Sequence, residues 1–374
     1  MDKSKIRKLG LIVNPIAGIG GRVGLKGSDT KEILEKAIKL GASPISPLRT
    51  KQFLKHLNPV KSAISIICYP KEMGESIVRE CGFSPIVIGN IKEGHTTAAD
   101  TKNAALKLRD MGVKLITFVG GDGTARDIFD TINQTIPVLG IPSGVKIYSS
   151  CFAINPRSAA RICMKFLWEE LPIRDGEVLD IDEEKYREQK LDIKFYGNLM
   201  VPYEPTLIQD SKIASPFTAN EHENQLGIAH QIIEEMDDKT IYILGPGTTV
   251  MAITEVLGEE KSLLGVDLLQ NKKIIALDVG EKQILNSIKN QNIKIIVSPL
   301  GRQGVLFGRG NQQISPRVIR EVGIENLIVL ATRYKLRTIN NLRVDTQDPE
   351  LDDELKGYIR VIVDYNELRM MKID

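Results

Sequence analysis

The sequence predicts an α/β protein, with an N-terminal domain built on a doubly wound parallel sheet and a C-terminal β-rich domain of the α+β kind. Its 374 residues exceed what one core ordinarily organises, at about 150 residues per domain. From residue 8 to residue 142, short apolar runs alternate with amphipathic segments, as parallel strands alternate with helices. Beyond residue 155, strand-like runs dominate and the alternation becomes irregular.

The N-terminal domain is expected to span residues 1–155. Its expected strands are 8–13, 63–70, 84–89, 114–121 and 136–142. Its expected helices are 30–42, 71–82, 96–112 and 124–132. Ligands of such sheets bind at the carboxyl ends of the strands, so the loops after these strands are the first candidates for a site.

The C-terminal domain is expected to span residues 156–374. Helices are expected at 158–171 and 223–236, the first of which places Trp168 in the core. Strands are expected at 176–182, 191–203, 240–247, 263–270, 273–280, 294–301, 326–332, 342–346 and 358–365. The sequence leaves open whether the last strands return to the first domain.

Charge and cysteine content narrow the class of protein. Lys and Arg total 50 and Asp and Glu total 48, so a net charge of +2 gives no reason to expect nucleic acid or an anionic membrane as the main partner. The four cysteines and four histidines show no metal-ligand spacing, so no protein metal site is expected. The N-terminus lacks a signal-peptide pattern and no apolar run reaches about 18 residues, so we expect a cytoplasmic protein. A homo-oligomer is compatible with all of this.

The stretch "FVGGDGTARDI" (118–128) is the first candidate site. Gly120, Gly121 and Gly123 are expected to allow positive φ and to let a phosphate approach the backbone closely. Thr124 would lie in a helix whose first N–H groups favour an anion. Asp122 would repel phosphate, so it either takes a proton from an attacking hydroxyl or binds a metal that bridges phosphates. The alternative is a structural turn in which Asp122 caps the helix.

Two other phosphate-binding patterns are absent. No G-x-x-x-x-G-K-[ST] occurs, and Val23 replaces the third glycine of a G-x-G-x-x-G that begins at Gly18. The chain therefore carries neither a P-loop nor a dinucleotide fingerprint.

"GGDGT" after a strand, together with "NPIAG" (14–18), resembles the superfamily of NAD kinases, diacylglycerol and sphingosine kinases and phosphofructokinases. The branch called ATP-NAD kinase-like, which includes the acetoin-catabolism X proteins, is the nearer resemblance. It rests on segments 13–29, 119–128, 140–150, 245–249, 301–316 and 342–361.

This resemblance implies a phosphate-donor-binding domain over 1–155 and an NAD-binding domain over 156–374. Asp122 would activate the 2′-hydroxyl of NAD, which attacks the terminal phosphate of ATP or polyphosphate to form NADP. Mg²⁺, or another divalent cation, would neutralise the phosphate charge. The residues implied beside the phosphates are Asn14, Gly120, Gly121, Gly123 and Thr124.

Two further segments are candidates for binding NAD. "GPGTT" supplies Gly245, Gly247, Thr248 and Thr249, and it resembles the Thr-Gly-Ser-Thr loop of NAD kinases; the alternative is an ordinary threonine N-cap. "GRQGVLFGRGNQQ" (301–313) offers arginines to phosphate and amides to a base or ribose. The alternative is a structural loop with solvated arginines. Its candidates are Arg302, Arg309, Asn311, Gln312 and Gln313.

Other polar residues receive structural interpretations or little weight. Asn220 and Glu221 resemble the Asn-Glu pair of NAD kinases, but Asn220 and Glu223 fit a capping box, and we interpret the segment as structural. Asp267 and Asp278 interrupt apolar strands and are expected either at the site or at a solvated edge.

"GIPSGVKIYSS" (140–150) departs from NAD kinases and resembles the lipid-kinase form, so Lys146, Tyr148 and Ser149 suit a different acceptor pocket. Three hypotheses follow: an NAD kinase, a kinase of another hydroxyl acceptor such as a lipid or small polyol, and a non-catalytic nucleotide-binding protein. No basic amphipathic helix supports membrane contact.

Overall fold

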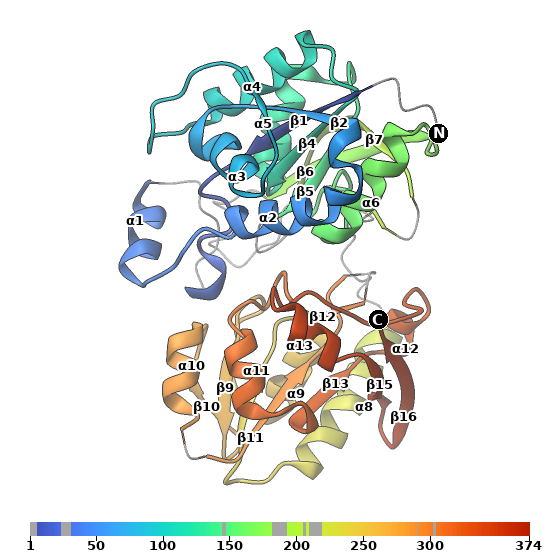
Figure 1. Ribbon diagram of the computed structural model, residues 1–374. Helices are drawn as coiled ribbons and strands as arrows, with labels where there is room; N and C mark the ends of the chain where they lie inside the picture. Colours follow the sequence, from blue (N-terminus) through green and yellow to red (C-terminus); the bar gives the residue numbers. More distant parts are fainter. Residues whose placement is uncertain are drawn as a thin grey trace. The chain divides into compact units, whose positions relative to one another are not determined.

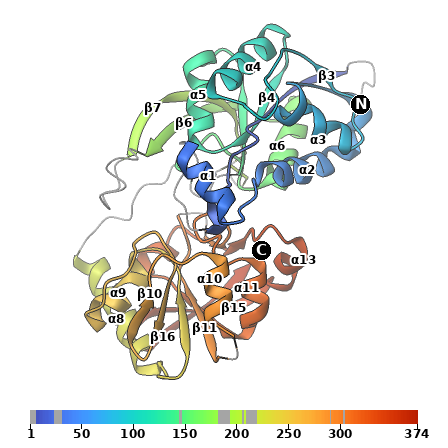
Figure 2. The same ribbon diagram turned by 90° about the vertical axis from the view of Figure 1, so that its left-hand side faces the viewer.

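A computed structural model describes residues 6–23, 31–143, 147–181, 193–204, 207–208, 219–289, 291–301 and 304–374. The chain divides into two compact units. The first consists mainly of residues 43–212 with the N-terminal strand, and the second mainly of residues 213–374. Each is described by itself below (Figures 1 and 2).

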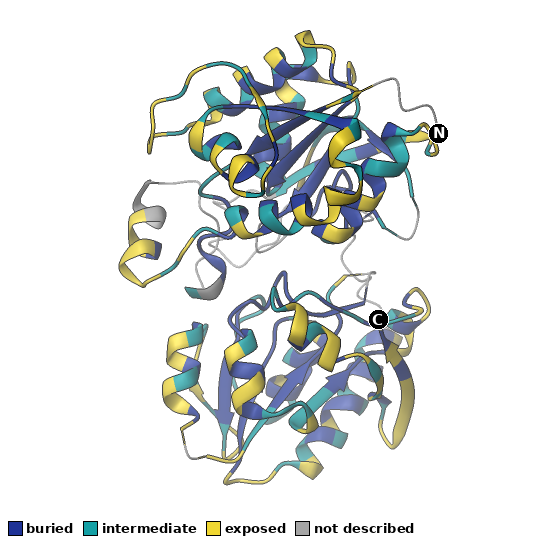
Figure 3. Ribbon diagram, in the orientation of Figure 1, coloured by how far each residue is buried: buried dark blue, intermediate teal, exposed yellow. Residues whose placement is uncertain are grey.

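The first unit is built on a five-stranded sheet in the order β3-β2-β1-β4-β5, in which every neighbouring pair is parallel. Its central strands are apolar and buried, as expected for strands covered on both faces (Figure 3). The bounds are β1 (Arg7–Val13), β2 (Ile64–Cys68), β3 (Ile86–Val87), β4 (Leu115–Gly120) and β5 (Val138–Pro142).

Two groups of helices cover this sheet. The helix α2 packs against α3 and α6, and α4 packs against α5 (Figure 1). The bounds are α2 (Ser46–Leu57), α3 (Glu75–Glu80), α4 (Ala98–Asp110), α5 (Asp122–Ile132) and α6 (Pro156–Leu167), with short 3-10 turns η2 (Asn58–Ala63) and η3 (Lys71–Met73). The 3-10 turn η1 (Gly21–Val23) and residues 35–39 of α1 (Lys31–Lys39) group with the second unit. The strand order reverses between β1 and β4, so the first unit is doubly wound as predicted.

An antiparallel hairpin completes the first unit. Strands β6 (Ile173–Ile181) and β7 (Ile193–Pro202) pair with each other and contact α5 and β5. Its residues Val178 and Leu199 are fully buried in the same core as Phe118 and Phe152, whose rings meet edge to face at 5.1 Å.

The structure therefore places α6, β6 and β7 in the first unit, whereas the sequence predicted a boundary at residue 156. The strand-like runs beyond residue 155 suggested a new domain, but the apolar faces of these elements pack on the first core. Trp168 is partly buried against that core, and the Arg7 guanidinium lies 4.2 Å from the centre of its ring.

The second unit is built on a seven-stranded sheet in the order β10-β9-β8-β11-β13-β15-β16. Strands β8, β11, β13 and β15 are parallel, and the remaining pairs are antiparallel. The bounds are β8 (Ile241–Leu244), β9 (Asp267–Gln270), β10 (Lys273–Ala276), β11 (Ile293–Val297), β13 (Leu327–Leu330), β15 (Gly357–Asp364) and β16 (Glu367–Ile373), with a separate parallel pair β12 (Val305–Phe307) and β14 (Arg343–Val344).

Helices cover both faces of this second sheet. Along β11, Ile295 and Val297 lie in one apolar core, and Ile296 between them lies in the other. The bounds are α8 (Ala219–Glu235), α9 (Thr248–Leu257), α10 (Glu281–Ser287), α11 (Pro316–Val322), α12 (Arg333–Leu336) and α13 (Pro349–Glu354), with one 3-10 turn, η4 (Ile324–Asn326). The predicted strand-rich C-terminal domain is thus confirmed, and its last strands pair within its own sheet.

Candidate functional site

The loops after β1 and β4 meet at the point where the strand order of the first sheet reverses. The Asn14 backbone N–H donates to the Val119 carbonyl at 3.0 Å, and the Asn14 side-chain amide donates to the Thr124 hydroxyl at 3.0 Å. Asn14 and Thr124 are 110 positions apart in the chain. In open α/β sheets, ligands bind in the crevice at this reversal point, so the structure brings two of the predicted residues to the expected place.

The loop "NPIAG" then passes close to the end of β5. Gly18 has a φ of +80°, and a Cβ atom there would lie 2.0 Å from the Ser143 carbonyl oxygen. The Ser143 N–H in turn donates to the Gly120 carbonyl at 3.0 Å. Gly18 is therefore required both for its conformation and for this close approach.

The glycines of "GGDGT" are needed for space, and the expectation of positive φ is wrong. None of Gly120, Gly121 and Gly123 has a positive φ. A Cβ atom on Gly120 would lie 2.4 Å from the Thr124 hydroxyl oxygen, so the absence of a side chain lets Thr124 lie against the strand end. Gly121 is the N-cap of α5 in an extended conformation.

Asp122 occupies the first turn of α5 and is 7% exposed. Its side chain does not cap its own helix; its two oxygens accept backbone N–H groups of Tyr148 at 2.7 Å and Ser149 at 3.0 Å. Burial raises the pKa of Asp122 to about 6, although the hydrogen bonds from Ser149 and Tyr148 act in the opposite direction. The carboxylate is thus fixed in place and titrates near the pH at which a general base is most useful.

Tyr148 and Ser149 are occupied in holding this carboxylate. The Ser149 hydroxyl also donates to the Leu179 carbonyl at 2.9 Å and accepts the Leu179 N–H at 3.0 Å, which ties the loop to β6. Both residues are buried. Lys146, the third residue of the suggested acceptor pocket, lies outside the described residues. No residue type signals this role, because the interaction uses backbone N–H groups.

In the second unit, "GPGTT" joins β8 to α9. The Gly245 N–H donates to the Ile296 carbonyl at 2.8 Å, and Gly247 is the N-cap of α9 with a φ of +109°. Thr248 and Thr249 are therefore the first helical residues, and the threonine N-cap interpretation is wrong. Thr248 accepts a hydrogen bond from the Gln225 amide at 3.3 Å, whereas the fully buried Thr249 hydroxyl has no hydrogen-bond partner within the described ranges.

In the glycine-rich loop after β11, some of the predicted side chains hold the loop together and others have unpartnered polar atoms. The Asn311 amide donates to the Leu306 carbonyl at 2.7 Å and its oxygen accepts the Gly308 N–H at 3.0 Å, so both ends serve the loop itself. Arg309 is buried rather than solvated. The side-chain oxygens of Gln312 and Gln313 are buried and have no hydrogen-bond partner in the described part of the chain. Arg302 lies outside the described residues.

Asp267 lies neither at the candidate site nor at a solvated edge, the two places expected for it. It is fully buried, and its carboxylate accepts hydrogen bonds from the Lys261 ammonium and the Ser262 hydroxyl, both at 2.8 Å, and from the Asp278 N–H at 2.7 Å. This set of bonds compensates the burial of both charges, so the pair is structural.

The segment around Asn220 also differs from the prediction. The helix α8 begins at Ala219, so Asn220 lies inside it, and the capping box with Glu223 is wrong. Glu221 is the buried acid, and it accepts a hydrogen bond from the Thr332 hydroxyl at 2.7 Å. By contrast, Thr97 N-caps α4 in a capping box with Asp100.

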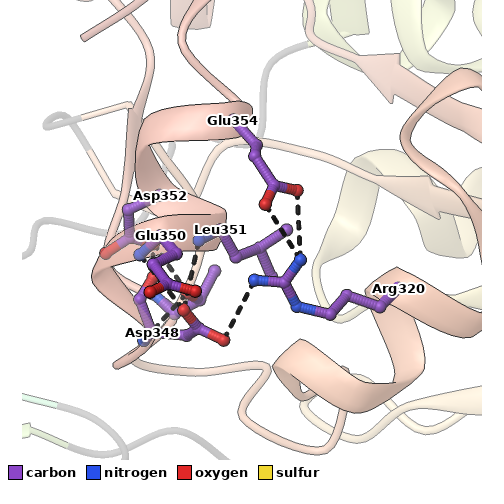
Figure 4. Close-up of polar contacts among 7 residues, drawn as sticks. Arg320, Asp348, Glu350, Leu351, Asp352 and Glu354 are labelled. Atoms are coloured by element: carbon purple, nitrogen blue, oxygen red, sulfur yellow. Dashed lines mark hydrogen bonds and ion pairs between the residues drawn. The ribbon is translucent and has the colours of Figure 1, made fainter.

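The acidic stretch 345–354 supports its own turn. Asp348 accepts the N–H groups of Glu350 and Leu351, both at 3.1 Å, and Arg320 donates to Glu354 at 3.0 Å (Figure 4). The N–H of Leu351 and the Arg320 guanidinium hold the pKa of Asp348 below its usual range.

Over the residues with described positions, no group of three or more His, Cys, Asp or Glu side chains could hold a metal ion. Among the same residues, no helix is both long and apolar enough to cross a bilayer.

Comparison with known proteins identifies the family. Residues 9–170 match the model of the ATP-NAD kinase N-terminal domain, and residues 237–373 match that of the ATP-NAD kinase C-terminal domain. No curated protein matches the chain.

Solved structures offer only distant similarity. A putative UDP-N-acetylglucosamine 2-epimerase from Listeria monocytogenes is 10% identical over 93% of this chain and 82% of that chain, with a TM-score of 0.26. A protein of unknown function from Vibrio parahaemolyticus is 12% identical over 38% of this chain and 85% of that chain, with a TM-score of 0.18. Scores this low carry no inference about fold or function. The two domain models, which together cover most of the sequence in the expected order, show that the chain belongs to the NAD kinase-like family.

Proposed function

We propose that the protein transfers a phosphoryl group from ATP or polyphosphate to the 2′-hydroxyl of NAD and so forms NADP. The family supports a kinase-like enzyme that acts on nucleotides. The observation that carries the proposal is Asp122: it is buried, fixed by two backbone N–H groups, and has a pKa near 6. A surface cap would need none of these properties.

In the proposed reaction, Asp122 removes the proton from the hydroxyl as its oxygen attacks the terminal phosphorus. The new bond joins the hydroxyl oxygen to phosphorus, and the bond from phosphorus to the bridging oxygen of the donor breaks. The shortened donor leaves with the electron pair of that bond. Each carboxylate oxygen of Asp122 accepts one backbone N–H, which leaves further lone pairs for the proton.

The first turn of α5 would bind the donor phosphates. A helix leaves its first N–H groups without intrahelical partners, and they favour an anion. The Asn14–Thr124 hydrogen bond fixes both polar side chains beside that turn. A phosphate-bound Mg²⁺ keeps several waters and ordinarily needs only one or two protein carboxylates, and such an ion would neutralise phosphate charge.

The acceptor would bind through the second unit. Thr248 and Thr249 open α9 without capping it, so their hydroxyls and N–H groups suit a ribose or phosphate. The unpartnered oxygens of Gln312 and Gln313 suit an amide or amino donor of the dinucleotide.

The test is NADP formation by the purified protein with NAD, Mg²⁺ and either ATP or polyphosphate. We expect Asp122→Asn to lower turnover by about 10²–10⁴-fold while NAD binding persists. Asp130→Asn, the same change at an exposed position of α5, is the matched control and should leave turnover unchanged. Thermal unfolding of both variants is needed, because an amide at 122 has only one oxygen for two N–H groups.

The result that contradicts the proposal is a folded wild-type protein that forms no NADP with either donor. If it still binds nucleotide, the search moves to other hydroxyl acceptors, lipids or small polyols. Equal NADP formation by wild type and Asp122→Asn would instead remove Asp122 from the chemistry.

A further inference from the structure

The second sheet has its own reversal of strand order, between β8 and β11. The loops after β8, β11 and β13 lie at the carboxyl ends of three adjacent parallel strands. A Cβ atom on Gly245 would lie 3.0 Å from a Val297 methyl group, so the turn before α9 starts directly beside the residue that precedes Ser298. This is the edge at which an α/β sheet binds ligands.

Lys335, from α12, supplies a cation to this edge. Its ammonium donates to the Ser298 hydroxyl at 2.9 Å, and its backbone N–H donates to the Thr332 hydroxyl at 3.3 Å. The ammonium has three N–H donors, and across the described residues it has this one hydrogen-bond partner and no carboxylate in an ion pair. Burial lowers the pKa of Lys335 to about 8, although the charge of Glu221 acts in the opposite direction.

The start of α9 supplies N–H groups to the same edge. The ten-residue helix begins after Gly247, around which a Cβ atom would meet nothing within 4 Å. The Thr249 hydroxyl is fully buried and, in the described part of the structure, has no hydrogen-bond partner. A buried hydroxyl without a partner costs free energy unless a ligand or water bonds to it.

The first turns of α8 join these two groups. Gln225 donates to Thr248 at 3.3 Å, and the adjacent Asn224 accepts the Arg333 N–H at 2.9 Å. The nearby acid, Glu221, accepts a hydrogen bond from Thr332. The start of α12 and the start of α9 are therefore held by neighbouring residues of one helix.

We propose that Lys335, the Ser298 hydroxyl and the first N–H groups of α9 form a phosphate-binding subsite of the second unit, which takes the pyrophosphate group of a dinucleotide. Lys335 binds as a point charge, and Ser298 orients its ammonium. The assignment of the subsite to a dinucleotide rests on the proposed function, whereas the binding of pyrophosphate does not. It adds to the predicted acceptor loop a cationic residue that lies 86 positions beyond Thr249 in the sequence.

The test is lysine footprinting of the full chain. The protein is acylated with a water-soluble N-hydroxysuccinimide ester, with and without inorganic pyrophosphate, and each lysine is quantified by peptide mass spectrometry. At ten times its dissociation constant, pyrophosphate should slow acylation of Lys335 about tenfold. Lys356, exposed and paired with Asp353, is the internal control and should react at the same rate in both samples.

Calorimetric titration with NAD provides the second measurement. Lys335→Met should weaken NAD binding about tenfold or more, Lys335→Arg should retain most of it, and Lys356→Met should match wild type. Acylation of Lys335 that pyrophosphate leaves unchanged would overturn the subsite, even if NADP forms. Protection of Lys335 in a protein that forms no NADP would support the subsite and reject the proposed reaction. The wild-type footprint decides the question if Lys335→Met does not fold.

Discussion

The two units each contain a glycine turn that joins a buried parallel strand to a helix, and the two turns differ in chemistry. After β4, "GGDGT" places the carboxylate of Asp122 in the first helical turn. After β8, "GPGTT" places Thr248 and Thr249 there, at the sheet edge where Lys335 of α12 donates to Ser298. The same backbone device therefore carries an acid that can take a proton in one unit, and hydroxyls near a cation in the other.

The glycines of the two turns also serve different physical needs. Gly120 has an ordinary φ but no room for a side chain, because Thr124 lies against it. Gly247 has open space around it but a φ of +109°, which L residues rarely adopt. A glycine in a strand-to-helix turn therefore does not by itself indicate a positive φ, because close packing can also require it.

The largest effect is expected from the buried ion pair beside the second turn. Lys261→Met leaves the Asp267 charge buried without its cation and should lower the free energy of unfolding of the second unit by about 3–5 kcal/mol. The Leu263 carbonyl, two residues beyond Lys261, accepts the Gly247 N–H, so the turn should loosen as well. Urea unfolding followed by far-UV circular dichroism measures the loss.

Two controls sharpen this result. Trp168, the only tryptophan, packs on the first core, so its fluorescence should report an unchanged first transition. Lys261→Met with Asp267→Leu removes both charges and should recover most of the stability. A loss below about 1 kcal/mol in the single variant would show that Ser262 and the Asp278 N–H suffice for the carboxylate.

The two glycines should respond differently to the same substitution. Gly120→Ala and Gly247→Ala should each lower stability by about 1–3 kcal/mol, the first by overpacking and the second by backbone strain. Adding Thr124→Gly should relieve the overpacking in Gly120→Ala, because the clash is with the Thr124 side chain. No side chain lies near Gly247, so no trimming should rescue Gly247→Ala. Thermal unfolding of the three variants measures this, and a failure of Thr124→Gly to rescue Gly120→Ala would contradict the distinction.

The smallest effect on activity is expected from pH, which should change kcat/KM by about tenfold per unit. As a base with a pKa near 6, Asp122 should cause kcat/KM to fall about tenfold for each pH unit below 6. The free energy of unfolding changes in the opposite direction and rises as the pH falls. The folded-state pKa lies above the ordinary 3.8, so ionisation of Asp122 costs about 3 kcal/mol above pH 6, and this cost disappears as the pH falls toward 3.8.

Paired pH profiles of activity and unfolding therefore test the base. Asp122→Asn should remove its share of the pH dependence from the unfolding curve. For Lys335 in the second unit the pH dependence of stability is reversed, because its pKa of about 8 lies below the usual lysine range. The cost of its buried charge is present below pH 8 and disappears as the pH rises toward that range. An activity profile that stays flat down to pH 5 would contradict the role of Asp122.

The sequence by itself determined the elements and the class of the first site. Apolar runs and glycine stops located β1, β4 and β5, and "GGDGT" placed Asp122 at a helix start, because strand and helix patterns and turn residues act over a few neighbouring positions. The tertiary structure decided what each polar group does. Asp122 depends on N–H groups 26 and 27 positions away, Asn14 on a hydroxyl 110 positions away, and Lys335 on Ser298 37 positions away. Burial, pKa and hydrogen-bond partners arise from such distant contacts, so local patterns could neither place α6 in the first unit nor show that Asn311 serves its own loop.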